Sequence, residues 1–562
     1  MRERARDVTS RGDGLFSKRW PLMTLCQQMA ENFHVMRADF TRARYISEEF
    51  GSYLMTGRPA RCHRDLKNSF SAMLRRDQWF HARTDNDAVN NDRSAKIWLD
   101  NASKTMRRAM YDTRANFVRA TKEADGDFVA FGNAVITREI CDYSHLLYRC
   151  WHLRDVAWDE SITGRINTVH FDWKPQARQL QEYARKGEFD LSPKVAELKN
   201  EEAFREVKCR RILLPADQYD LSPQKLKGRP FVSVYVDVEN QHILQERPLR
   251  SLQVTIPRWE FGGSAYGNQY GYSPAVIYGL PDGRMMQQMM LSMLTASEMA
   301  TFPPMIAVGE AINGAVNLYA AGVTQADADY DERTGEVLRS LNLNFEGIRY
   351  GAEQMERLEA GLDDSFYLNK IRFPEIKKET TAYEASKLYE EFIRQSLPLF
   401  EPVEVEYNQE LCDGTFEDLL PLGTFGSVEE MPQILRGRDI TWEFDTPITV
   451  ATEKALLGLY QGMVQTLVEG AQVDPTVALL ADMPKAARGA IDGNGSPPDW
   501  LVSEDQFAQL KAQKQQQDAA TAAAEQVAHG ADVATRVGKA AQSAGDAAQS
   551  LQGAGLAPQP GA

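Results

Sequence analysis

The sequence has few cysteines, no long hydrophobic run and no apolar leader at its start. Its six cysteines are scattered without a Cys-x-x-Cys pair, which disfavours a zinc site or a disulfide framework and fits a reducing compartment. No apolar run approaches the ~18 residues that a membrane-spanning helix needs, so we predict no transmembrane helix. Residues 1–7 carry charge without an apolar stretch behind them, and we predict no signal peptide.

Motifs that mark enzymes are also missing. The phosphate-binding pattern Gly-x-x-x-x-Gly-Lys-Ser/Thr does not occur, and the glycines of segment 262–274 lack the Gly-x-Gly-x-x-Gly spacing. His152 lies near Asp155, and His170 lies near Asp172, but no serine or cysteine nucleophile motif accompanies either pair. We interpret these residues as polar positions of a half-exposed sheet. The sequence therefore predicts no catalytic residues and no enzyme activity.

Acidic clusters are present but do not fit a metal site. The run 327–332 is acidic, yet it lacks the glycine and the spaced terminal glutamate of a calcium loop. Carboxylates on the predicted long helix lack the Glu-x-x-His pairs of carboxylate-bridged metal bundles. We predict neither a metal nor a cofactor. The helix carboxylates are Glu390, Glu391, Glu401, Glu404, Glu406 and Glu410.

Length and composition indicate an ordinary folded protein with several domains. The chain has 562 residues, of which 43% are hydrophobic and 25% are charged. Its net charge of −15 disfavours a protein that grips DNA tightly through a basic field. The same charge is compatible with a channel through which DNA slides, because acidic walls repel phosphates.

The first half of the chain is predicted to form helices followed by an α+β body. Apolar residues recur at spacings of three and four in 22–40 and again in 87–119, which predicts helices that each bury one face. After residue 131, β-branched and aromatic residues become frequent. The predicted strands are 131–140, 146–152, 155–169 (two strands joined by a turn at Gly164), 231–238 and 252–261, with an exposed helix over 174–200.

The second half is predicted to be mainly helical. Ser273 and Pro274 begin a methionine-rich helix, whose methionines favour adaptable packing. A very long helix is predicted from Thr380, with a kink near Pro398 and Pro402 because proline removes a backbone donor. The other segments, in chain order, are an exit at 301–305, a glycine-punctuated acidic stretch 306–349, a helix 351–364, a non-helical insert 366–378, a strand 440–447, helices 449–468 and 474–491, and an Ala/Gln-rich tail from 511.

This order of segments resembles the portal proteins, or head–tail connectors, of short-tailed bacteriophages. The resemblance is strongest at 271–304 and at 380–447. It implies an α+β, mainly helical portal fold that assembles as a ring. The implied parts are an N-terminal wing (1–270), a first stem helix (271–300), a clip (301–349), a second stem helix (350–365), a channel loop (366–379), a spine helix with a closing wing strand (380–450), crown helices (451–510) and a C-terminal tail that is flexible or marginally helical (511–562).

The resemblance also implies a function and a set of partners. Portal proteins form a ring of twelve copies at one capsid vertex, through which viral double-stranded DNA is packaged and ejected. The implied partners are the terminase, a tail adaptor, and capsid and internal core or scaffold proteins, with no membrane. The implied location is the virion, after assembly in the host cytoplasm. The alternatives are a smaller neck or tail adaptor ring without a packaging role, and a DNA-processing enzyme such as a nuclease.

The insert between the second stem helix and the spine helix carries the candidate DNA contacts. It is basic within an acidic protein, and the resemblance places it at the channel, where contacts with phosphates are independent of sequence. The alternative is an ordinary solvated loop on the outer surface. The candidate residues are Lys370, Arg372, Lys377 and Lys378.

Overall fold

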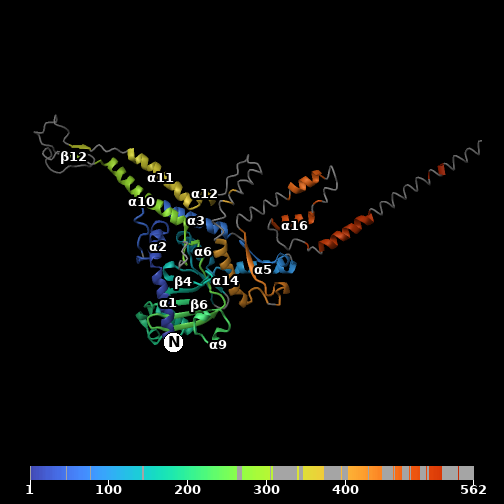
Figure 1. The fold of residues 1–562 in the computed structure, drawn as a ribbon, viewed down its shortest axis with the longest axis horizontal. Helices are drawn as coiled ribbons and strands as arrows, with labels where there is room; N and C mark the ends of the chain where they lie inside the picture. Colours follow the sequence, from blue (N-terminus) through green and yellow to red (C-terminus); the bar gives the residue numbers. More distant parts are fainter. Residues whose placement is uncertain are drawn as a thin grey trace, which may run out of the picture. The chain divides into compact units, whose positions relative to one another are not determined.

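The computed structural model divides into two compact units, Met1–Thr466 and Leu467–Ala562. It describes most of the first unit and short pieces of the second (Figure 1). The described residues are 2–45, 47–75, 78–90, 92–141, 145–261, 269–303, 305–307, 338–340, 346–371, 391, 394, 403–427, 429–445, 460, 462–470, 480, 482–493, 502, 506–521, 539 and 542–543.

A five-stranded antiparallel sheet forms one end of the first unit, and helix α1 (Arg2–Lys18) packs on one of its faces. Ala5 and Val8 of α1 lie against Ile212 and Val234 of the sheet in an apolar cluster. Alternate residues of these strands point to the opposite face, because side chains alternate along a strand. In spatial order the strands are β4 (Val156–Glu160), β5 (Ile166–Trp173), β6 (Cys209–Pro215), β7 (Phe231–Asp237) and β8 (His242–Leu249).

Helices and a smaller sheet make up the main core. Helix α6 is buried along most of its length, with Phe128 stacked at 5.1 Å on Trp259. A three-stranded sheet in the order β3-β2-β9 packs against it. The helices are α2 (Trp20–Asn32), α3 (Arg58–Leu74), α4 (Asp87–Asn90), α5 (Arg93–Met110) and α6 (Phe117–Phe131), and the strands are β2 (Ile136–Cys141), β3 (His145–Cys150) and β9 (Val254–Thr255).

Strand β1 (Phe80–Thr84) pairs with β14 (Ile440–Phe444), so two segments about 360 positions apart form one ribbon. The aromatic residues Trp79, Phe80, Trp442 and Phe444 pack on one another there. The remaining elements of this unit are α7 (Ala177–Arg185), α8 (Pro193–Ala196), α9 (Pro223–Leu226), β10 (Glu260–Phe261), β11 (Gly271–Tyr272), α10 (Pro274–Thr301), β12 (Met305–Ala307), β13 (Leu338–Ser340), α11 (Glu346–Ser365), α12 (Leu368–Ile371), a π-helix (Val403–Gln409), α14 (Glu410–Leu419) and short 3-10 turns.

In the second unit, α16 (Met483–Gly493) overlaps the predicted helix 474–491 and ends two residues beyond it, and residues 506–521 are helical and exposed. Among the described residues, none of the helices combines the length and the apolar character that crossing a membrane requires.

Several predicted elements are confirmed, and others are wrong in their limits. The strand–turn–strand around Gly164 and the strand at 231–238 are confirmed. Residues 131–135 are not a strand, because α6 continues to Phe131 and Gly132 ends it in the left-handed conformation. The predicted helix 87–119 is interrupted between Met110 and Phe117. The predicted helix 174–200 survives only as α7 and α8, and strand 252–261 only as two short pieces.

Gly132 is required where the end of α6 meets the segment before α10. Its φ is +73°, and a Cβ there would overlap the backbone of Tyr272 and Ser273. We expect Gly132→Ala to lower the unfolding free energy by more than about 3 kcal/mol, because strain and a backbone clash add. Gly164 has a φ of +76° with open space around it, so Gly164→Ala should cost only about 1 kcal/mol. Chemical denaturation gives the loss of unfolding free energy in each variant, and the difference between the two losses measures the clash. Equal losses in the two variants would contradict the clash at Gly132.

Candidate functional site

Helices α10 and α11 form a two-helix arm whose first half is rooted in the core (Figure 1). Ser273 caps α10 by accepting a hydrogen bond from the Val276 amide at 3.3 Å, and Pro274 occupies its first turn. All the buried residues of α10 lie between Pro274 and Met286. Beyond Met286 the helix exposes apolar side chains: Leu291 (42%), Leu294 (47%), Met299 (43%) and, just after its end, Phe302 (79%).

The root of the arm is fastened by aromatic and ionic contacts. Phe33 packs at 5.3 Å on Phe366, and Gly279 of α10 lets the ring of Phe366 approach closely. Arg58 of α3 donates from Nη2 to both carboxylate oxygens of Asp363 at 2.5 and 2.6 Å. The near end of α11 is therefore held by charge as well as by packing.

Pro281 lies inside α10, a position that the sequence-based prediction missed. Proline there removes one backbone hydrogen bond of the helix and favours a bend. Pro398 and Pro402, where the kink was predicted, lie outside the described residues.

The structure describes only one of the four candidate DNA contacts. Lys370 lies in α12, so the first residues of the predicted non-helical insert form a helical turn. Its Nζ lies 3.5 Å from an oxygen of Asp364 and 5.4 Å from the centre of the Tyr367 ring, and its side chain is 36% exposed. Arg372, Lys377 and Lys378 lie outside the described residues.

After residue 402 the chain returns to the core through the π-helix and α14. Arg75 donates to both oxygens of Asp125 at 2.8 Å, and its guanidinium lies 4.4 Å from the centre of the Tyr407 ring. The side chains of the pair are only 4% and 2% exposed. Burial alone would lower the pKa of Arg75, but the adjacent Asp125 carboxylate raises it, so the guanidinium stays charged. A buried ion pair, in which Nη1 of Arg75 donates to both carboxylate oxygens of Asp125, thus lies under the π-helix.

Further polar contacts fix the two ends of this helical segment. Glu406 accepts from the Arg258 amide at 3.0 Å. At the far end, Asp418 lies 3.4 Å from Arg138 and accepts from Ser251 at 3.0 Å. Two further side-chain hydrogen bonds hold α14, between Tyr148 and Thr415 (2.8 Å) and from Trp442 to Asp413 (2.7 Å). The segment 372–402 therefore connects two anchored ends, α12 on α3 and the π-helix on the core.

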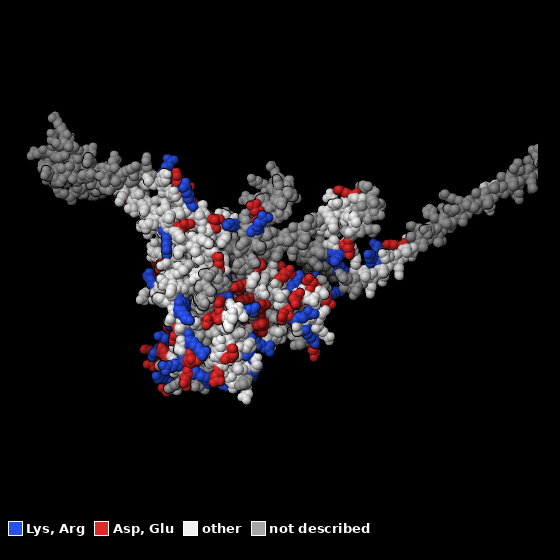
Figure 2. Space-filling model, in the orientation of Figure 1, with Lys and Arg blue, Asp and Glu red and all other residues white. Residues whose placement is uncertain are grey.

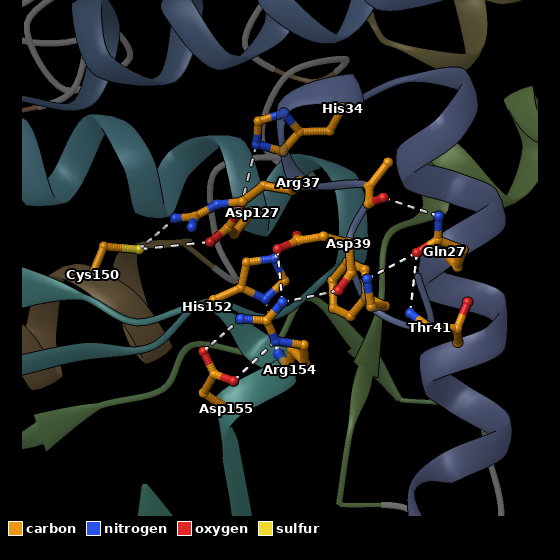
Figure 3. Close-up of polar contacts among 12 residues, drawn as sticks. Gln27, His34, Arg37, Asp39, Thr41, Asp127, Cys150, His152, Arg154 and Asp155 are labelled. Carbon is orange, nitrogen blue, oxygen red and sulfur yellow. Dashed lines mark hydrogen bonds and ion pairs between the residues drawn. The ribbon is translucent and has the colours of Figure 1, made fainter. Parts of the chain in front are cut away.

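A second buried polar cluster joins α2, α6 and the turn after β3 (Figure 3). Asp127 of α6 is 1% exposed and lies 3.1 Å from Arg37 and 3.4 Å from His34. Burial alone would raise the pKa of Asp127, but Arg37 and His34 hold it below the ordinary value. The ion pairs of this cluster compensate the cost of burying its charges.

The two histidine–aspartate pairs singled out in the sequence do not form catalytic pairs. His152 contacts Asp39 at 2.8 Å, while Asp155 pairs with Arg154 (Figure 3). The expected half-exposed position of His170 is wrong, since the residue is 1% exposed beneath α1. Burial lowers the pKa of His170 to about 3. The described residues contain no group of three or more potential metal ligands.

His63 makes the stability of the subunit depend on pH. Its Nε2 lies 2.9 Å from the Gly126 carbonyl oxygen and its ring lies 4.6 Å from that of His34. Burial, helped by the charges of His34 and Lys67, lowers the pKa of His63 to about 3. In the unfolded chain, His63 therefore binds a proton as the pH falls through about 6.5. In the folded chain it binds that proton only near pH 3.

We expect the unfolding free energy to fall as pH drops below about 6.5, by up to about 1.4 kcal/mol per pH unit from this one group. His63→Gln keeps a hydrogen-bond donor without a titrating ring, so it should reduce the dependence between pH 6 and 4 and leave the part that His170 contributes. Denaturation curves at several pH values measure the slope. An unchanged slope in the variant would contradict the assignment to His63.

The chain belongs to the family of bacteriophage head to tail connecting proteins, which its residues 5–502 match. It is also similar to a protein of Bordetella phage BPP-1 described as a probable portal protein, with 24% identity over 469 residues, 82% of this chain and 81% of that protein. The resemblance noted from the sequence is thereby confirmed for the family.

Among solved structures, the chain is similar to a chain from the neck of an empty GTA particle computed with C6 symmetry. The TM-score is 0.36 at 11% identity, and the match covers 83% of this chain and 94% of that one.

Proposed function

We propose that this protein is a portal protein, the ring at one capsid vertex through which double-stranded DNA enters and leaves. The observation that carries the proposal is the family match over residues 5–502, nearly the whole chain. The relative described as a probable portal protein has comparable length, since the match covers 81% of it. That size favours a portal over a smaller neck or tail adaptor ring. An in vitro packaging assay with the terminase separates these two functions.

In this proposal the arm is the stem of the portal. Segments 271–300 and 350–365 are the stem helices, and 301–349 is the clip that binds the terminase before packaging and a tail adaptor afterwards. Residues 1–270 form the wing, 380–450 form the spine helix and the closing wing strand, and 451–510 form the crown. Capsid and internal core or scaffold proteins are further partners. The protein resides in the virion after assembly in the host cytoplasm.

The exposed apolar side of α10 requires neighbouring subunits. Leu291, Leu294 and Met299 are each more than 40% exposed, and a patch of this kind is typical of a protein interface. A cyclic ring covers such a patch with a different face of the next subunit. We therefore expect native mass spectrometry to find a closed oligomer of about twelve copies, the number that the family implies. Negative-stain images should show it as a ring.

Charge on this surface should break the ring. We expect Leu291→Glu combined with Leu294→Glu to give monomers, because burying two unpaired carboxylates is costly. The control is Ile162→Glu with Phe204→Glu, which charges two apolar residues of the sheet region that are 108% and 56% exposed. A stable monomer of the unaltered protein under all assembly conditions, or a ring that tolerates the arm substitutions, would contradict the stem assignment.

Segment 366–379 would line the channel in such a ring. Its first residues form α12, which contacts α3, and further along the chain the π-helix is buried in the core. This attachment supports a loop that a ring can present at a fixed position. Few basic residues per subunit suffice, because the symmetry of a ring repeats each of them. Both signs of charge are interspersed over the visible face of the first unit (Figure 2).

A further inference from the structure

A cleft of about 510 Å³ opens on the face of the five-stranded sheet that α1 does not cover. Arg211 of β6 is the central residue of this face, since its register partners are Phe171 on β5 and Tyr235 on β7. Ser233 of β7 lies in the next row, opposite Arg247 of β8. The three-stranded sheet, through β2 and β3, and the α7 region supply the rest of the lining. The volume lies within the ~300–1,000 Å³ typical of ligand sites.

The base of the cleft holds polar groups that the described residues leave unsatisfied. Arg211 is 3% exposed and Ser233 is 2% exposed. Arg211 pairs through Nη1 with Glu139, but its Nε and the hydroxyl of Ser233 have no hydrogen-bond partner in the described part of the chain. Buried polar groups without partners are rare and cost stability. A ligand that supplies an acceptor here would recover that cost.

Aromatic rings form one wall of the cleft. The ring of Phe189 lies 5.0 Å from Tyr183, 5.2 Å from Tyr235 and 6.4 Å from Trp173. The Arg211 guanidinium lies 5.5 Å from the centre of the Tyr235 ring. These rings offer flat apolar surface beside a buried positive charge, which suits an aromatic side chain.

Basic side chains stand at the rim. Arg149 of β3 and Arg247 of β8 are exposed, and neither makes an ion pair with the residues that the structure describes. The lining contains four basic residues and two acidic ones, in a chain with a net charge of −15. The cleft is thus a local basic site in an acidic protein, and arginine is the residue that best binds carboxylates at two points.

We propose that this cleft docks an extended acidic segment of a partner protein, with one aromatic side chain against the ring wall and flanking carboxylates on Arg149, Arg211 and Arg247. Strand β8 is the edge strand of its sheet, but the Asp190 amide already donates to its Leu244 carbonyl at 2.8 Å. The arginines and the ring wall, and not an added strand, would therefore hold the segment. The site is separate from the arm and from segment 366–379. It therefore adds a partner surface that the proposed function does not require.

The test uses the full-length assembled protein and the fluorescein-labelled peptide acetyl-Glu-Asp-Phe-Glu-Asp-amide, with binding followed by fluorescence anisotropy. Two comparison peptides replace the acids by Gln and Asn, or the Phe by Ala. We expect either change to weaken binding by about tenfold or more, since both the charges and the ring contribute. A benzophenone in place of the phenyl ring should crosslink within the wall that contains Trp173 and Tyr235.

Variants of the cleft complete the test. Arg149→Glu with Arg247→Glu should weaken binding about tenfold or more, and Ser233→Ala should weaken it roughly threefold through one lost hydrogen bond. The control, Arg6→Glu with Arg108→Glu, reverses two exposed arginines elsewhere and should leave binding unchanged. Equal affinity of the amide peptide, unchanged affinity in both cleft variants, or binding of inorganic phosphate without the peptide would overturn the proposal.

Discussion

The quadruple alanine variant of segment 366–379 is expected to assemble into normal rings and to lose packaged DNA. The substitutions are Lys370→Ala, Arg372→Ala, Lys377→Ala and Lys378→Ala. Each removes one positive charge per subunit, so a ring of about twelve copies loses close to fifty charges along its channel. Because phosphate contacts act through released counterions, their loss weakens the hold on DNA by orders of magnitude at physiological salt.

The structure refines this expectation for one of the four residues. Lys370 lies 3.5 Å from Asp364, so part of its charge is already balanced within the subunit. We therefore expect a triple variant that keeps Lys370 to show nearly the full loss. Lys370→Ala alone should have a small effect.

The measurement is the length of DNA protected from nuclease inside filled heads, with ring assembly checked by native mass spectrometry. The matched control removes four exposed lysines of the first unit, away from the arm: Lys174, Lys194, Lys199 and Lys208, each changed to Ala. It should package normally. The channel assignment is falsified if the quadruple variant packages and holds a full-length genome as well as the control does.

Elements that depend on near neighbours in the chain were predictable from the sequence. The start of α10 at Ser273 and Pro274 follows from local capping chemistry. The strands around Gly164 follow from a turn residue between two β-rich runs. The family resemblance similarly followed from the order of such segments and not from any single motif.

Features that depend on distant partners were not predictable. Strand β1 is five residues long and is stabilised by pairing with β14, about 360 positions later in the chain. No local sequence pattern predicts this pairing. In the sequence nothing distinguishes Arg75, Arg138 and Arg258 from arginines on a surface. Only the tertiary structure shows that their contacts hold the π-helix and α14 on the core. A cleft lined from six strands and a helix leaves no linear signature either.

The buried pair of Arg75 and Asp125 supplies the second large expected effect. Taking two charges out of water is costly, and only their mutual contact offsets that cost. Removing one partner leaves the other buried without compensation. We therefore expect Arg75→Met alone, or Asp125→Ala alone, to lower the unfolding free energy by about 3–5 kcal/mol.

The double variant Arg75→Met/Asp125→Ala distinguishes a coupled pair from two independent residues. Its loss should be far smaller than the sum of the single losses, because no buried charge remains. Denaturation measures the three losses, and hydrogen exchange over 403–419 should rise in the single variants as the π-helix above the pair loosens. The control is Arg83→Ala, which breaks the exposed pair with Glu443 at 2.7 Å and should cost under about 1 kcal/mol. Additive losses in the double variant would show that the π-helix and α14 are held by packing alone. The ion pair would then not contribute to anchoring the chain that follows the proposed channel segment.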